Sequence, residues 1–157
     1  MTITKFSGQF SFLSNFYGSV LEYEGVKYPT VEHAFQAAKT QDSETRHQIA
    51  KMQTPSEAKA AGNRNGILKD FDPVEWELRK DGVMEELLRI KFQNPDLKNL
   101  LAQTGNAKLI EGNTWGDTYW GVDVVTGEGT NKLGVILERI RSEAPTHPIA
   151  EASPCAA

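Results

Sequence analysis

The sequence holds a single cysteine, Cys155, which lies close to its end. An intramolecular disulfide therefore cannot form, and no cysteine-based metal site is available. The three histidines, His33, His47 and His147, lack the spacing of metal ligands. Patterns for a serine or cysteine nucleophile are missing too, which disfavours acyl transfer. We expect neither a metal ion nor a cofactor.

Long apolar runs and an excess of positive charge are also lacking. No stretch approaches the roughly 20 apolar residues of a membrane span, and the N-terminus has no apolar segment typical of a signal peptide. We therefore expect a soluble, cytoplasmic protein without a membrane partner. The 21 acidic and 17 basic residues give a net charge of −4. This balance argues against unselective binding to phosphate backbones but allows a local basic patch.

Residues 20–28 predict a small β-hairpin that turns at Glu24-Gly25. The next segment predicts a helix with Thr30 as its N-cap. Its buried face consists of apolar residues at helical spacing, namely Val31, Ala34, Phe35 and Ala38.

Five further helices are expected, over residues 44–52, 55–62 with Thr54 as the cap, 74–92, 96–104 and 131–141. Residues 112–129 are irregular and rich in glycine and aromatic side chains, as functional loops often are. With 39% hydrophobic residues, the 157-residue chain can bury one continuous core. We predict an α+β, helix-dominated fold, a compact single domain over residues 1–142 with a small N-terminal β-hairpin. Residues 143–157 should form a disordered tail.

A stripe of polar side chains, Glu32, Gln36 and Lys39, follows the helix that Thr30 begins. At about 100° per residue these positions fall within roughly 60° of one another, beside the apolar face, as in a cleft wall. Free N–H groups and the helix dipole should lower the pKa of Glu32 at the second helical position. An ionised carboxylate there could stabilise the cation that forms when a C–N glycosidic bond breaks. Charges at helix ends are also common for stability alone.

Residues 113–121 combine Trp115, Asp117, Tyr119 and Trp120 with two glycines. Such a segment can stack a planar base, because glycine lets the backbone approach a ligand closely. The alternative is that the tryptophans pack in the core or in a lid, which is the more usual role of an isolated tryptophan.

Lys39 and Arg64 are candidates for binding a phosphate, although isolated basic side chains are more often solvated. The glycines that precede the last helix could also offer N–H groups to a phosphate. Helix capping by Thr130 or Asn131 explains that segment equally well.

Five motifs follow one another along the chain. They are Phe12-x-Ser14-Asn15-Phe16, Gly25-x-x-Tyr28-Pro29-Thr30-x-Glu32-His33-x-Phe35-Gln36-x-x-Lys39, Lys91-Phe92, Tyr119-Trp120-Gly121 and Gly129-Thr130-Asn131-Lys132-Leu133-Gly134. In this order they resemble the NADAR, or YbiA-like, family of N-glycosidases over about residues 6–141. The string from Glu32 to Lys39 is the most specific part of the resemblance.

The resemblance implies the YbiA-like fold, a compact helical domain with small strands, and hydrolysis of an N-glycosidic bond to ribose. Some family members cleave early riboflavin-pathway intermediates that join a base to a ribose phosphate, and some remove ADP-ribose from guanine in nucleic acid. The expected partner is a small nucleotide or ADP-ribosyl substrate, or ADP-ribosylated nucleic acid. The alternative is a non-catalytic module on the same fold that binds a nucleotide or ADP-ribose.

The resemblance implies roles for Glu32, Lys39, Asn15, Asp117 and Trp120, and the residue patterns described above add the other candidates. The expected catalytic residues are Glu32, Lys39 and Asp117. The expected substrate-binding residues are Asn15, Phe16, Gln36, Arg64, Trp120 and Asp123. Glu32 would stabilise an oxocarbenium-like transition state or activate water, unless Lys39 traps the ring-opened sugar as an imine. Residues 122–125 differ from the YbiA-like branch, so the sequence leaves open whether Asp117 or Asp123 faces the sugar.

Overall fold

The computed structural model describes residues 1–143, and the tail expected over residues 143–157 lies outside them apart from Glu143. The helices are η1 (Gly8–Leu13, a 3-10 helix), α1 (Val31–Ala37), α2 (Ser43–Ala50), α3 (Pro55–Ala61), α4 (Pro73–Lys91), α5 (Pro95–Gln103) and α6 (Lys132–Glu143). The strands are β1 (Thr2–Ile3), β2 (Leu21–Tyr23), β3 (Val26–Tyr28), β4 (Lys108–Leu109), β5 (Gly112–Asn113) and β6 (Val122–Asp123). The predicted α+β, helix-dominated class is confirmed.

Side-chain caps explain where five of these helices begin. Thr30, Asp42, Thr54, Asp72 and Asn94 each accept a hydrogen bond from a backbone N–H of the following turn. Three of these caps precede a proline at the first helical position, where the missing N–H costs nothing. The predicted caps Thr30 and Thr54 are confirmed, and the predicted helix bounds lie within two residues of the observed ones.

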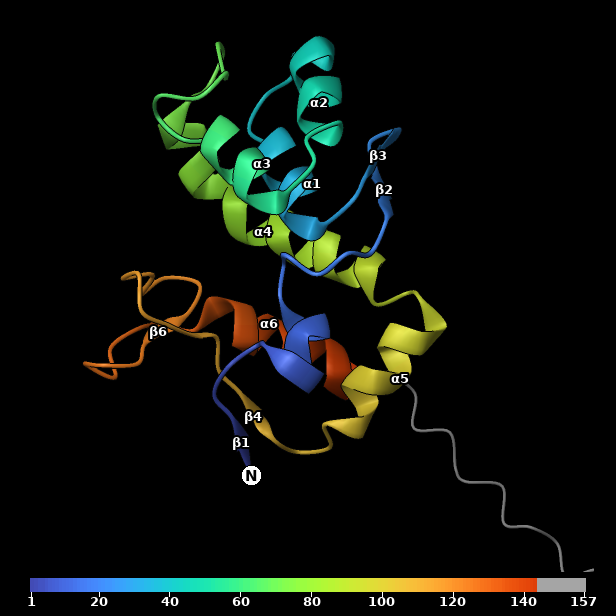
Figure 1. Cartoon of the computed structure of the whole chain (residues 1–157), viewed down its shortest axis with the longest axis vertical. Coiled ribbons are helices and arrows are strands. Elements are labelled where there is room, and N and C mark those ends of the chain that lie inside the picture. The colour runs from blue at the N-terminus through green and yellow to red at the C-terminus, as the bar shows by residue number, and fades with distance from the viewer. Residues whose placement is uncertain (144–157) are drawn as a thin grey trace, which may run out of the picture.

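Figure 1 shows two groups of elements joined by the long helix α4. The hairpin β2–β3 and helices α1, α2 and α3 pack against one another, and α4 contacts α1 and β2 of this group. On the other side α4 contacts α6, which packs against β4 and α5. The core runs through both contacts, because Leu87, Leu88, Val31, Leu133 and Leu137 are all fully buried.

Two parallel strand pairs bring distant segments together. β1 pairs with β4, Thr2 opposite Lys108, and β5 pairs with β6, Gly112 opposite Val122. Neither pair was predicted, whereas the antiparallel hairpin β2–β3 was. The two pairs place residues 108–113 between the N-terminal residues and the loop before α6.

The side chain of Asn131 makes two hydrogen bonds to the backbone of this middle segment. Its Oδ1 accepts from the N–H of Glu111 at 3.0 Å, and its Nδ2 donates to the carbonyl of Leu109 at 2.8 Å. We call these two bonds the Asn131 clasp. Asn131 has a positive φ of 50°, a conformation that asparagine tolerates better than most residues.

Two glycines allow the backbone to approach the clasped segment. A Cβ on Gly121 would lie 2.2 Å from the carbonyl oxygen of Glu111, and one on Gly134 would lie 2.0 Å from that of Leu109. Gly121 and Gly134 are therefore required by close packing against residues 109–111. Among residues 1–143 the structure contains no helix with the length and apolarity needed to cross a membrane.

Candidate active site

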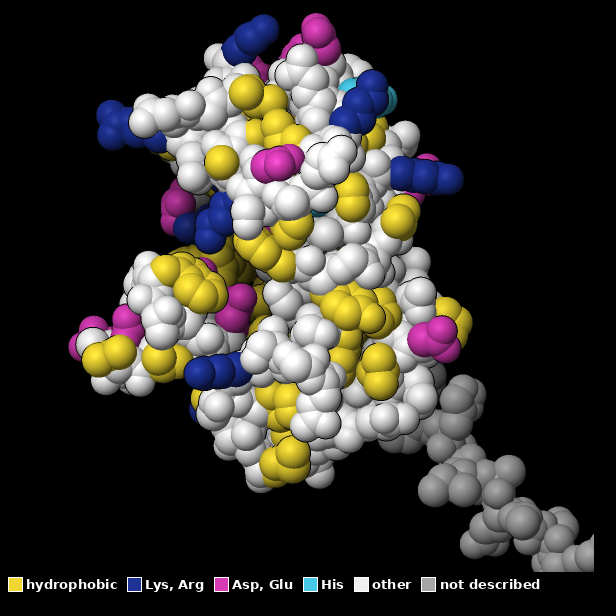
Figure 2. Space-filling view, in the orientation of Figure 1, with side chains coloured by type: hydrophobic (Ala, Val, Ile, Leu, Met, Phe, Trp, Pro, Cys, Tyr) yellow, Lys and Arg dark blue, Asp and Glu magenta, His cyan; other side chains and the backbone are white. Residues whose placement is uncertain are grey.

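A cavity of about 730 Å³ lies between the two groups of elements. Its walls come from the turn at residues 14–16, from α1, α3 and α4, and from residues 111–117. Figure 2 shows a hollow on this side of the molecule, with hydrophobic side chains inside it and acidic and basic side chains near its edge. Of the nine site residues predicted from the sequence, all but Arg64 and Asp123 line the cavity.

Glu32 projects into the cavity from the first turn of α1 and is only 7% exposed. Its Oε1 accepts a hydrogen bond of 2.7 Å from Nε2 of Gln36, one turn later. Its backbone N–H donates to the carbonyl of Asn15 at 3.1 Å. The predicted stripe and the turn at residues 14–16 are therefore joined at Glu32.

The prediction of a lowered pKa for Glu32 is wrong. Burial raises the pKa of this carboxyl, and the hydrogen bond from Gln36 and the charges of Lys59 and Lys39 only moderate the effect. The N–H groups of Glu32 and His33 are bonded to Asn15 and Thr30, so neither is free to stabilise the carboxylate. Glu32 keeps its proton to a higher pH than an exposed glutamate does.

Lys39 lies just beyond the last residue of α1, where its Nζ donates to the carbonyl of Gly62 at 3.1 Å. The same nitrogen lies 5.8 Å from the ring centroids of both Phe71 and Trp76. Burial lowers the pKa of Lys39, while Glu32 acts in the opposite direction. A larger share of this amine is neutral, and so nucleophilic, than in an exposed lysine.

Three aromatic rings form one wall of the cavity. Phe35 contacts Trp76 at a centroid distance of 5.0 Å and meets Trp120 edge to face at 5.5 Å. All three side chains line the cavity. A planar ring could pack against this wall, with Trp115, which is 67% exposed, and Phe16 at the rim.

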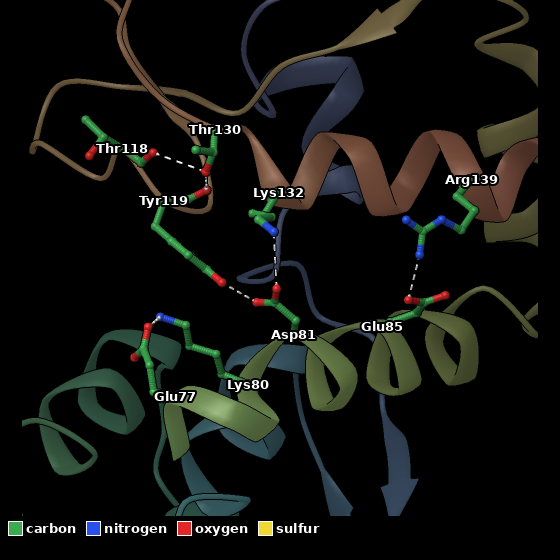
Figure 3. Close-up of polar contacts among 9 residues, drawn as sticks. All are labelled: Glu77, Lys80, Asp81, Glu85, Thr118, Tyr119, Thr130, Lys132 and Arg139. Atoms are coloured by element: carbon green, nitrogen blue, oxygen red, sulfur yellow. Dashed lines mark hydrogen bonds and ion pairs between the residues drawn. The ribbon is translucent and has the colours of Figure 1, made fainter. Parts of the chain in front are cut away.

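Tyr119 does not line the cavity but anchors the loop that carries Trp120. Its hydroxyl donates to the carboxylate of Asp81 on α4, which also accepts from Nζ of Lys132 at 3.3 Å. Thr130 donates to the carbonyl of Tyr119 at 2.6 Å, as Figure 3 shows. Tyr119 meets Trp120 edge to face, so this network holds Trp120 in the cavity wall.

Asn15 and Asp117 present polar atoms to the cavity in different ways. Within residues 1–143, the buried Oδ1 of Asn15 has no hydrogen-bond partner, so this acceptor is available to a ligand. Asp117 uses Oδ1 to accept from the N–H groups of Tyr119 and Trp120 at 3.1 and 2.9 Å. One oxygen of Asp117 therefore shapes the loop.

Arg64 and Asp123 lie outside the cavity. Arg64 is exposed in the segment after α3. Asp123 accepts from the N–H groups of Val125 and Thr126 at 2.8 and 2.9 Å, so its carboxylate caps a turn. Between the two aspartates that the sequence left open, Asp117 is the one at the cavity.

Several lining residues were missed in the sequence, above all Glu111. Burial raises the pKa of its carboxyl to about 7, and the negative charges of Asp117 and Glu32 add to this effect. Glu111 lies between two-residue strands, outside every periodic pattern, so no sequence signal pointed to it. Lys59 of α3 and Lys80 of α4 also line the cavity and bring positive charge to it.

The arrangement suits chemistry on a ring attached to a charged group. Carboxyl groups and the amine of Lys39 line one cavity, which also has an aromatic wall and lysines on two helices. Within residues 1–143, no group of three or more His, Cys, Asp or Glu side chains could hold a metal ion.

Comparison with known proteins agrees with this picture. The model of the NADAR domain matches residues 4–144. The chain is 38% identical to N-glycosidase YbiA of Shigella flexneri serotype 5b over 139 residues, 87% of this chain and 83% of that protein. It is 31% identical to the riboflavin biosynthesis protein VVA0006 of Vibrio vulnificus, of which it covers 36%. The NMR structure of the Escherichia coli protein YbiA superposes with a TM-score of 0.75 at 35% identity, covering 90% of this chain and 82% of that one.

Proposed function

Because this chain belongs to the NADAR domain family, we propose that it is an N-glycosidase that hydrolyses the C–N bond between a base and a phosphorylated ribose. The observation that carries the proposal is the stripe of Glu32, Gln36 and Lys39, which lines one cavity with an aromatic wall. The volume of about 730 Å³ falls within the range of small-molecule sites. The lysines at the cavity suit a substrate that carries phosphate.

In the proposed reaction the base packs against Trp120 and the ribose lies near Glu32. Positive charge develops at C1′ as the C–N bond weakens, and the Glu32 carboxylate stabilises it or activates the attacking water. The free Oδ1 of Asn15 accepts a hydrogen bond from a ribose hydroxyl. Asp117 contributes its second carboxylate oxygen to the same sugar.

Lys39 offers a second route from the same site. Because burial lowers its pKa, the amine of Lys39 could attack the ring-opened sugar and form an imine that water then hydrolyses. Borohydride reduces an imine to a stable amine. Mass spectrometry of borohydride-treated protein therefore separates the routes, because a sugar adduct on Lys39 appears only in the second.

Two classes of compound are candidate substrates for this site. Ribosylamino-pyrimidine phosphates are small and charged, and fit the cavity with its lysines. ADP-ribosylated guanine in nucleic acid is favoured by Trp115, whose exposed ring at the rim could stack a neighbouring base. We lean slightly to the ADP-ribosyl substrate, because such recognition needs stacking more than contacts to a long phosphate backbone.

The deciding experiment incubates the protein with each substrate class and follows the release of base or ADP-ribose by mass spectrometry. We expect release from at least one class. Cleavage confined to the pyrimidine phosphates would reverse our leaning toward ADP-ribose. Tight binding of ADP-ribose or ribose phosphates in calorimetry, with no product from either class, would instead support a non-catalytic binding module.

Gly62→Ala should lower kcat by roughly 10- to 100-fold with a small effect on stability. A Cβ at this position would lie 1.9 Å from Oε1 of Gln36, so the Gln36 side chain must leave its place beside Glu32. Loss of one hydrogen bond to a charged group is worth about 1.5–3 kcal/mol. The measurement is the kcat of the purified variant, alongside its melting temperature.

Gly82→Ala is the matched control for this change. Gly82 lies within α4, and a Cβ there would meet nothing within 4 Å. This variant should keep full activity and gain up to about 1 kcal/mol of stability, as glycine replacements in helices do. Equal kcat values for the Gly62 and Gly82 variants would contradict the role given to Gln36.

A further inference from the structure

Glu111 is a cavity-lining carboxyl to which the proposed reaction assigns no role. It lies between β4 and β5 and lines the cavity together with residues of α1. Within residues 1–143, no side chain or backbone group donates a hydrogen bond to its carboxyl oxygens, in contrast to Glu32 and Asp117. Its hydrogen-bonding capacity is therefore left for a ligand.

Although Glu111 lies outside regular secondary structure, both its backbone N–H and its carbonyl are hydrogen-bonded. Its N–H donates to Oδ1 of Asn131, and its carbonyl accepts from the N–H of Val122 at 2.9 Å. Gly121 packs directly against that carbonyl, where any side chain would clash. The motifs around Gly121 and Asn131 thus act together to place one carboxyl group at the cavity.

The charges that face Glu111 are Glu32 from α1, Asp117 from the loop after β5 and Lys59 from α3. The remaining charges of the cavity lining come from Lys5, Lys39, Glu77 and Lys80. Three carboxyl groups in one cavity cannot all ionise easily, because each negative charge disfavours ionisation of the others. The amide of Gln36 donates to Glu32 and so favours the negative charge there. The hydrogen bond from Gln36 thus favours the ionised form of Glu32, and among residues 1–143 no such donor favours the ionised form of Glu111.

We propose that Glu111 is the general acid of the site, which protonates the leaving base while Glu32 acts as the carboxylate. This inference rests on the proposed N-glycosidase function. As the C1′–N bond breaks, its electron pair stays on the nitrogen, which takes the proton of the Glu111 carboxyl. Water bonds to C1′ and gives one proton to Glu32. The proton then returns from Glu32 to Glu111 through solvent, so the net reaction consumes one water.

The proposal makes a specific statement about pH. Burial raises the pKa of Glu111 to about 7, so its protonated form is lost as the pH rises through that value. The rate on a base that must be protonated should fall over the same interval. A purely structural Glu111 would not produce this alkaline limb.

Glu111→Gln tests the role of the proton with a neutral side chain of the same shape. On the substrate that the wild type cleaves, kcat should fall 100-fold or more, and the alkaline limb near pH 7 should vanish. Glu111→Asp keeps an acid and should restore the limb with part of the rate. Glu22→Gln, an exposed change on β2 outside the cavity, should leave both the rate and the pH profile unchanged.

Nicotinamide mononucleotide serves as the second probe. Its pyridinium ring leaves as a neutral base and needs no proton, so Glu111→Gln should retain wild-type hydrolysis of this compound within about fivefold. Glu32→Gln should lose hydrolysis of both compounds. If wild type does not cleave this probe, the pH profiles and the Glu111→Asp rescue decide alone.

The outcomes distinguish failure of the proposed N-glycosidase function from failure of the role given to Glu111. Wild-type protein that releases no base from any ribosyl substrate would overturn the proposed function and this inference with it. Active wild type, with a Glu111→Gln variant that keeps its rate or its alkaline limb, would overturn the role of Glu111 alone. A variant that loses both substrates equally, or that melts well below wild type, while Glu111→Asp fails to restore the limb, would show that Glu111 only supports the structure.

Discussion

Glu32→Gln should lower kcat at least 100-fold and leave the fold intact. Glutamine retains the size of the side chain but cannot carry the negative charge that stabilises developing positive charge at C1′. A loss of 100-fold corresponds to roughly 3 kcal/mol of transition-state stabilisation. Steady-state kinetics on the substrate identified above measure the effect, and near-wild-type turnover would exclude Glu32 as a catalytic residue.

Glu44→Gln is a close control, because Glu44 occupies the same second position of α2 that Glu32 occupies in α1. Glu44 is exposed and lies outside the cavity. Both changes remove a first-turn charge, so a general effect on helix ends would appear in both variants. Only the Glu32 variant should lose activity.

The Glu32→Gln variant should be at least as stable as wild type, and its advantage should grow as the pH rises. The pKa of Glu32 is raised in the folded state, so the folded protein binds this proton more tightly than the unfolded chain does. Wild-type stability therefore loses this contribution as the pH rises above the unfolded pKa. Glutamine does not ionise, and denaturant titrations at pH 5 and pH 8 should show the difference between the two proteins widening.

Asn131→Ala should lower the free energy of unfolding by about 2–4 kcal/mol. The change breaks both bonds of the clasp and leaves the N–H of Glu111 and the carbonyl of Leu109 without their partner. It also puts alanine at a φ of 50°, which costs roughly 1 kcal/mol more. For a chain of this size the melting temperature should fall by roughly 6–12 °C in calorimetry.

Asn131→Asp separates the contributions of the two hydrogen bonds of the clasp to stability. Aspartate keeps an oxygen to accept from Glu111 and tolerates the positive φ, but it cannot donate to Leu109. Its loss of stability should lie between those of wild type and the alanine variant. An alanine variant with wild-type stability would show that the clasp contributes little to the fold.

The sequence predicted the helices well because their signals are local. Caps such as Thr30 and Asp72 precede the first turn, and the apolar spacing within each helix identifies its buried face. The pairs β1–β4 and β5–β6 were not predicted, since each strand has two residues and Thr2 pairs with Lys108 far along the chain. Two residues carry no usable periodicity.

The residues of the candidate site also fall into those with a local sequence signal and those without one. Glu32, Gln36 and Lys39 were predicted to share a cleft wall because one helix sets their relative directions. Glu111 depends on contacts with Asn131 and Val122 that only the folded chain brings together. The direction of the Glu32 pKa was missed for a related reason, because helix position is visible in the sequence and depth of burial is not.

The parallel pair of β1 with β4 and the Asn131 clasp together set an order for biosynthesis. A ribosome releases Glu32, Gln36 and Lys39 early, but the first residues of the chain must wait for Lys108 to emerge before they find a partner. Glu111 waits longer still, until Asn131 has left the exit tunnel. A nascent chain that ends before Asn131 therefore already contains every residue that lines the cavity, but it lacks the side chain that fixes the backbone of Glu111.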